Sequence, residues 1–349
     1  MRALPCPASA CRRAAGFAVL VLGIPSWRAA TAQARAIAPA AYYTTYSHQH
    51  PVLAHIRPGE PISVRTLDAL GNDEKGVSRG PGGNPLLGPL YVDGAEAGDA
   101  VRIHFTAMRL NRSWGFSNLR LVLTSLLPDS VERVFPNKFR ADAVVKGRSD
   151  LVRWEIDGTK NTVRLLDPAS KVVKLEFDAR PMLGCVAVAP PGDRAYSSGV
   201  SGTYGGNLDY DEVRAGTTII LPVYHPGALI FLGDAHALQG DGEAVGTGIE
   251  TSMEVELTVD LVKHASIAGP RLIGAGFIAS VGSQQEFVSS LDRALQMATS
   301  DMVTWLTTDY KLEPWAAHAL IGFQATYRVA SVAGSVALSI PTRVLPNKP

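Results

Sequence analysis

Cysteine is scarce in this sequence, with three cysteines among 349 residues. Cys6 and Cys11 lie in an N-terminal segment that we expect to be removed, which leaves Cys185 alone in the mature chain. One thiol cannot form an internal disulfide, so no disulfide framework is expected to stabilise the fold. The neighbours of Cys185 are apolar, which predicts a buried strand residue rather than a nucleophile.

The sequence also lacks an excess of charge of either sign and lacks a long apolar run. Its formal net charge is +1. Without a basic run, it does not carry the electrostatic footprint of a nucleic-acid-binding protein. The apolar run at residues 14–24 is shorter than the roughly twenty residues that a membrane-spanning helix needs, and no later stretch is more apolar. We therefore expect no nucleic-acid partner and no membrane association once the N-terminal segment is removed.

Residues 1–34 have the pattern of a secretory signal peptide. Arg12 and Arg13 precede the apolar run, and Ala32 and Ala34 place small residues at the spacing that a signal peptidase requires. We predict that cleavage leaves residues 35–349 and that the protein is exported, either to the periplasm or as a secreted protein. A chain of this length can form a large core, in one elaborate domain or in two.

Alternating apolar and polar residues predict many short strands. The clearest alternation covers residues 254–262, and residues 62–67 also show it. Apolar residues recur every three or four positions over residues 284–307, which predicts an amphipathic helix. Pro314 fits the first turn of a second helix, which we expect to reach Ala330. The predicted fold class is α+β and predominantly β, with sandwich-like or barrel-like sheets and two helices near the C-terminus.

Residues 233–243, with the sequence GDAHALQGDGE, hold two Asp, one Glu and one His among three glycines. They follow an apolar segment that has the composition of a strand, so we expect a polar loop at the end of a sheet. Glycine allows the backbone to approach a ligand closely, and Asp, Glu and His together can bind a divalent metal or transfer protons. The alternative is an ordinary turn between strands, because Gly-Asp and Asp-Gly pairs mark such turns.

Five blocks of the chain combine Gly, Pro, Asn and acidic residues at defined spacing. They are Asn84-Pro85 with residues 88–99 (GPLYVDGAEAGD), residues 184–190 (GCVAVAP), residues 205–209 (GGNLD), residues 221–229, and residues 233–243 followed by Glu250. In order and spacing these blocks resemble the acetamidase/formamidase family, including its G-G-N-M-D and G-D-x-H-x-x-Q-G-D-G-E segments. Leu87, Asp93 and Ala97 depart from the Thr, Glu and Pro that are usual there.

The resemblance implies a function for residues 35–349 as one catalytic unit. That unit would hydrolyse small linear amides, of the formamide or acetamide type, to a carboxylic acid and ammonia. The resemblance also implies a β-rich α+β fold and a homo-oligomer.

Amide hydrolysis needs an activated water, an electrophile that polarises the carbonyl, and an acid for the departing nitrogen. The sequence has no G-x-S-x-G motif and no cysteine with a suitable partner, so a metal-assisted route is favoured over a covalent one. We expect Asp68, Asp234 and His236 to bind a divalent metal that activates a water. Zinc is favoured over calcium because a histidine is present.

Four further residues complete the predicted site. Glu243 or Glu250 is expected to act as general base and then as acid, and Asn207 and Asp209 are expected to hold the amide NH2 group. Structural alternatives exist: Asp209 can organise a turn, Glu250 can be an ion-paired strand end, and His236 can be a satisfied buried histidine. For the whole protein, the alternatives are a hydrolase of another amide or a lactam, and an exported ligand-binding protein without catalysis.

Overall fold

The computed structural model describes residues 33–127, 130, 151–265, 267–283 and 290–347. The chain separates into two units, Met1–Gln33 and Ala34–Pro349, and every described strand and helix belongs to the second. The predicted signal peptide, residues 1–34, lies outside the described residues apart from its last two positions. The start of the predicted helix, at residues 284–289, lies outside them as well.

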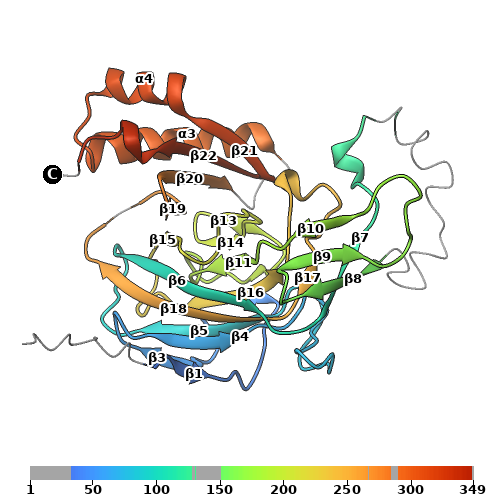
Figure 1. Cartoon of the computed structure of the whole chain (residues 1–349). Helices are drawn as coiled ribbons and strands as arrows, with labels where there is room; N and C mark the ends of the chain where they lie inside the picture. The colour runs from blue at the N-terminus through green and yellow to red at the C-terminus, as the bar shows by residue number, and fades with distance from the viewer. Residues whose placement is uncertain (1–32, 128–129, 131–150, 266, 284–289, 348–349) are drawn as a thin grey trace, which may run out of the picture. The chain divides into compact units, whose positions relative to one another are not determined.

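Two large β-sheets form most of the described chain (Figure 1). The nine-stranded sheet has the order β1 (Arg35–Ile37), β4 (Ile62–Arg65), β18 (Met253–Val262), β6 (Ala100–Leu110), β15 (Thr218–Pro222), β19 (Arg271–Gly274), β20 (Phe277–Ser283), β22 (Ser335–Pro341), β21 (Thr326–Ser331). The 11-stranded sheet has the order β10 (Glu176–Asp178), β9 (Thr162–Leu165), β8 (Leu151–Asp157), β7 (Trp114–Asn118), β17 (Glu250–Thr251), β16 (Ile230–His236), β11 (Met182–Ala187), β14 (Gly205–Asn207), β13 (Ser201–Gly202), with β5 (Leu86–Val92) on β16 and β3 (Ala54–Ile56) on β5. A separate pair consists of β2 (Thr45–Tyr46) and β12 (Tyr196–Ser197).

One continuous apolar core joins the two sheets. It contains Ile103 and Val255 from the nine-stranded sheet together with Leu86, Val186 and Phe231 from the 11-stranded sheet. Burial of each such side chain contributes roughly 1.5–3 kcal/mol to folding, and inner-face residues of two packed sheets interdigitate in this way. The prediction of a predominantly β, α+β fold is confirmed.

Two helices near the C-terminus, α3 (Leu291–Thr308) and α4 (Pro314–Gln324), confirm the predicted helical region. α3 packs on β20 and β22 (Figure 1). A buried ion pair fixes it there, because the guanidinium of Arg271 on β19 donates to both carboxylate oxygens of Asp301 at 2.8 and 2.9 Å. None of the described helices has the length and apolar character needed to cross a membrane.

The second helix is shorter than predicted, and this correction bears on the site. The helix ends at Gln324, Ala325 is extended with ψ 148°, and β21 begins at Thr326. Three of the six residues of β21 are Thr, Tyr and Val, which favour strands when a partner is available. β21 pairs with β22.

Candidate active site

The end of β16 carries two buried polar side chains, Asp234 and His236. The prediction of a loop over residues 233–243 was wrong for its first four residues, which continue the strand. Their backbone stays in the sheet because it has partners on both sides: Ala235 pairs with β11 and β17, and Gly233 pairs with β11 and β5. His236 lies opposite Glu250 of β17 in this register.

Five ionisable side chains meet at this end of the sheet. Asp209, Asp234 and His236 form one group whose ligand atoms all lie within 4.8 Å of one another, and His236, Glu243 and Glu250 form a second such group. All are buried except Glu243, which is half-buried. The structure therefore brings together five of the seven residues predicted from the sequence, from segments up to 41 residues apart (209 to 250).

Gln239 fixes the ring of His236. The side-chain amide of Gln239 donates from Nε2 to the backbone oxygen of Asp209 at 2.5 Å, so its Oε1 faces His236 Nδ1 at 2.9 Å and accepts from it. Nδ1 therefore carries a hydrogen and Nε2 faces the cluster. Nε2 lies 3.1 Å from Glu250 Oε1 and 3.4 Å from Asp234 Oδ1, but neither contact has hydrogen-bond geometry.

Several buried atoms of the cluster have no hydrogen-bond partner among the described residues. They are Asp209 Oδ1, Asp234 Oδ1, His236 Nε2 and Glu250 Oε2. A buried polar atom left unpaired costs about 1–3 kcal/mol, so four of them together indicate a site built for a ligand. Carboxylate oxygens and an imidazole nitrogen are ligands of divalent metals, and the residues present fit such an ion.

The electrostatics of the cluster also favour an added positive charge. Burial raises the pKa of Asp209 well above its usual range, and the charges of Glu243 and Asp234 raise it further. Burial also raises the pKa of Glu243 and brings that of Glu250 to about 7. For His236, burial lowers the pKa, but the carboxylates of Glu250 and Asp234 outweigh burial and leave it well above the usual value. A proton and a metal cation compete for such a position.

Two glycines leave room for these side chains. A Cβ at Gly184 of β11 would lie 2.5 Å from both Asp209 Oδ1 and Asp234 Oδ2. A Cβ at Gly248 would overlap the ring of His236. The approach of the two carboxylates and the position of the imidazole thus depend on the absence of side chains at these positions.

Backbone strain is concentrated at the cluster. Nine described residues other than glycine have positive φ, and four of them lie at this site: Asn84 (55°), Asp209 (48°), Asp234 (57°) and Glu243 (47°). Residues outside the favoured regions persist where the surrounding structure fixes them, and such residues gather at functional sites.

β21 holds the short helix that carries Glu243, η2 (Asp241–Glu243). The hydroxyl of Ser331 donates to Glu243 Oε2 at 3.2 Å, and the guanidinium of Arg328 donates to both carboxylate oxygens of Asp241 at 2.5 and 2.9 Å. Because Arg328 lies where we expected helix and Ser331 directly follows the end of the predicted helix, no sequence pattern indicated how Glu243 is positioned.

Amide side chains line one side of the cluster. Asn207 Nδ2 donates to Asp209 Oδ2 at 2.7 Å, and Asn84 Nδ2 donates to Asn207 Oδ1 at 3.3 Å and to Asp234 Oδ2 at 3.0 Å. Cys185 donates to Asn207 Oδ1 at 2.9 Å. Its thiol is buried, and burial raises the pKa of Cys185 well above its usual value. The thiol is thus kept protonated, and its predicted place in a buried strand is observed.

Asp68 lies in neither group, although we expected it to bind a metal. Its carboxylate accepts from the buried guanidinium of Arg112 at 2.8 Å and from the backbone N–H groups of Leu70 and Asn72, each at 2.9 Å. These donors already satisfy the charge of Asp68, so the structure gives it an ion pair and a turn rather than a place in the cluster.

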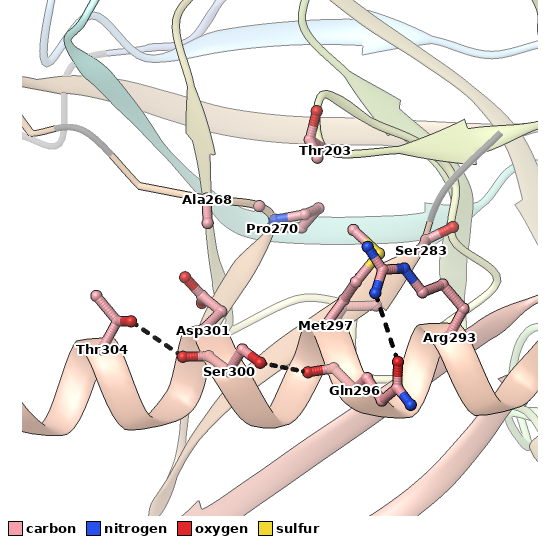
Figure 2. Close-up of a pocket in the computed structure, with 12 residues that line it drawn as sticks. Thr203, Ala268, Pro270, Ser283, Arg293, Gln296, Met297, Ser300, Asp301 and Thr304 are labelled. Carbon is pink, nitrogen blue, oxygen red and sulfur yellow. Dashed lines mark hydrogen bonds between the residues drawn. The ribbon is translucent and has the colours of Figure 1, made fainter. Parts of the chain in front are cut away.

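The cluster is distinct from the cavity shown in Figure 2. That cavity, of about 260 Å³, lies between β20 and α3 and is lined by residues such as Ser283, Met297 and Asp301. None of the five clustered side chains lines it. Its most buried ionisable lining group, Asp301, is already paired with Arg271, so the chemistry belongs to the cluster.

Comparison with known proteins finds a similarity to one family of enzymes. A model of the "Acetamidase/Formamidase family" matches residues 187–273. A formamidase of Methylophilus methylotrophus is 25% identical over 255 residues, which cover 61% of this chain and 62% of the relative. An acetamidase of Mycolicibacterium smegmatis is 25% identical over 262 residues, which cover 61% of this chain and 64% of the relative. Residues 187–273 are thus similar to the acetamidase/formamidase family.

A solved structure shows that the fold extends over almost the whole chain. The acetamidase from Yersinia enterocolitica superimposes with a TM-score of 0.73 at 23% identity, covering 90% of this chain and 94% of that one. The alignments with the curated relatives span less than two thirds of their length, 62% and 64%. The family match at residues 187–273 contains Asn207 and all five clustered residues.

Several residues that build the site were not predicted to take part. Gly184, Asn84 and Gln239 stand in blocks that resemble the family, so their position was a usable signal, whereas Gly248 lies outside those blocks and had no such signal. The contacts that these residues make with the cluster form only when β11, β16 and β17 pair in the folded sheet.

Gly184→Ala should weaken the binding of divalent cations. The added Cβ would push the carboxylates of Asp209 and Asp234 apart, and changes next to metal ligands typically cost about 10- to 100-fold in affinity. Titration calorimetry with Zn²⁺ would measure this change. The control is Gly240→Ala, because a Cβ at Gly240 meets nothing within 4 Å. Unchanged affinity for Zn²⁺ in folded Gly184→Ala would show that cation binding does not depend on the close approach of the Asp209 and Asp234 carboxylates.

Proposed function

We propose that this protein hydrolyses the C–N bond of small linear amides, of the formamide or acetamide type, to a carboxylic acid and ammonia. The observation that carries the proposal is the buried cluster of Asp209, Asp234, His236 and Glu250, whose unpaired atoms lie within the segment that matches the family. Relatives that match this chain are a formamidase and an acetamidase.

The residues that would hold a divalent metal are Asp209, Asp234 and His236, with Glu250 beside the imidazole. Zinc is the proposed ion because an imidazole nitrogen is among the ligands. A bound divalent cation would polarise the amide carbonyl and lower the pKa of a water molecule towards neutrality. Asp68 is omitted from this set, since Arg112 already neutralises its carboxylate.

Glu243 is the proposed general base and acid. It is the one residue of the cluster that is only half-buried, whereas Glu250 is buried and its Oε1 accepts from the backbone of Gly248 at 3.1 Å. Ser331 holds one carboxylate oxygen of Glu243 and orients the group. A positioned carboxylate that takes a proton from water and returns it to the departing nitrogen accounts for both proton transfers.

Ammonia release from formamide, acetamide, propionamide and γ-butyrolactam tests the reaction. We expect turnover of the linear amides, and Glu243→Gln should lower kcat by about 10²- to 10⁴-fold, the usual contribution of a general acid–base group. The control, Glu155→Gln, alters an exposed carboxylate that pairs with Arg164 and should leave kcat unchanged.

Other results of this panel would identify the alternatives. Turnover of the lactam alone would make the protein a lactam hydrolase. Thermal stabilisation by amides without ammonia release would indicate a binding protein.

Removal of bound metal by dialysis against a chelator should abolish this activity. The orphaned buried atoms of the cluster then lack their ligand, and re-addition of Zn²⁺ should restore turnover. Elemental analysis before and after dialysis identifies the ion and its stoichiometry. Full activity in protein shown to be free of metal would sink the metal proposal and leave the amidase proposal standing.

We also propose that residues 1–34 direct export to the periplasm or the medium. The basis is the sequence pattern alone: two arginines, an apolar run and a small-residue cleavage site. N-terminal sequencing of the protein recovered from a cell fractionation should begin at Arg35. Recovery of intact chain starting at Met1 in the cytoplasmic fraction would contradict it. The homo-oligomer implied by the family resemblance stays a prediction.

A further inference from the structure

Asn84 lies beside the cluster without contributing a charge to it. It precedes β5, whose Leu86 pairs with Gly233 of β16, next to Asp234. Its φ of 55° is a conformation that Asn adopts more readily than most residues. The hydrogen bond from Nδ2 to Asp234 Oδ2, at 3.0 Å, places the Asn84 amide against the site.

The orientation of the Asn84 amide is determined by its neighbours. Asn207 Nδ2 donates to Asp209 Oδ2, so Asn207 Oδ1 faces Asn84 as an acceptor. Asp234 Oδ2 is a carboxylate oxygen and accepts as well. Turning the Asn84 amide over would place its oxygen against two acceptors, so the NH2 group must face the cluster.

This orientation leaves Asn84 Oδ1 as an available acceptor. Within the part of the chain that the structure describes, Asn84 Oδ1 makes no hydrogen bond, and Asn84 is half-buried whereas Asp209 and Asp234 are buried. Asn207, which we expected to hold the substrate NH2 group, uses both ends of its amide within the network. The uncharged acceptor beside the cluster is therefore Asn84.

We propose that Asn84 Oδ1 accepts a hydrogen bond from the nitrogen of the amide substrate and thereby selects amides that carry an N–H over esters of the same acyl group. This inference rests on the proposed amide hydrolysis. An ester has an oxygen where the amide has its N–H, so it cannot donate to Asn84. A site with a placed hydrogen-bonding group discriminates against analogues that lack the partner.

A positioning role for Asn84 makes a different prediction. Asn84 Nδ2 also orients Asp234 and Asn207, and loss of that function would slow every substrate equally. Loss of the contact from Oδ1 would slow only substrates that donate an N–H. The ratio of kcat/KM for acetamide to kcat/KM for methyl acetate separates the two roles.

Asn84→Gly tests the proposal, because glycine tolerates the positive φ while removing the side chain. We expect the amide-to-ester ratio to fall about 10- to 100-fold, the size of one hydrogen bond left unmade. The matched control is Asn161→Gly, which also has φ 55° and donates to the backbone of Ala179 in a β-hairpin. Its ratio should equal that of the wild type.

Equal losses for amide and ester in Asn84→Gly would overturn the inference and leave the proposed function standing. If the ester is not turned over, its inhibition constant against acetamide replaces its rate. In Asn84→Gly this inhibition constant should change less than KM for acetamide does. An equal change in the two constants would overturn the inference. Absence of ammonia release from every amide by the wild-type protein would overturn the proposed function and this inference with it.

Discussion

The gathering of four carboxyl groups, three of them buried and one half-buried, around one imidazole is the constraint on which the site depends. Among the described residues, none of Asp209, Asp234, Glu243 and Glu250 pairs with a Lys or Arg side chain; their charged neighbour is His236. Burying like charges together is costly unless protons or a cation neutralise them. The fold maintains this arrangement by surrounding it with paired sheets, so the cluster cannot relax by moving apart.

Close pairing of the strands around β16, and glycines that leave space there, hold the clustered side chains together. β16 is buried along its whole length and pairs with β5, β11 and β17. Gly184 and Gly248 leave the space that carboxylates and imidazole occupy. Gln239 determines which ring nitrogen of His236 faces the cluster. Gly184, Gly248 and Gln239 carry no charge, yet they determine where the ionisable side chains of the cluster lie.

The sequence predicted the residues of the cluster better than their surroundings. Asp234, His236, Glu243 and Glu250 lie within one short stretch, where acidic residues, histidine and glycine stand close enough for a local pattern to be visible. Local periodicity also found the strands and α3. The end of α4 at Gln324 was missed because pairing with β22 decides the conformation of residues 326–331. Tertiary pairing of this kind overrides the helical pattern of the preceding residues.

Asp68 shows why the predicted metal set needed the structure. In the sequence, Asp68 and Asp234 are both acidic residues near turns, and both are buried in the fold. Arg112, 44 residues away, pairs with Asp68 at 2.8 Å, so that carboxylate is neutralised. Removal of one partner from such a buried pair typically costs about 3–5 kcal/mol, which marks it as structural. Among the described residues, Asp234 has no such Arg or Lys partner. The distinction between a carboxylate that supports the fold and one that can bind a ligand therefore lies in which cation reaches it.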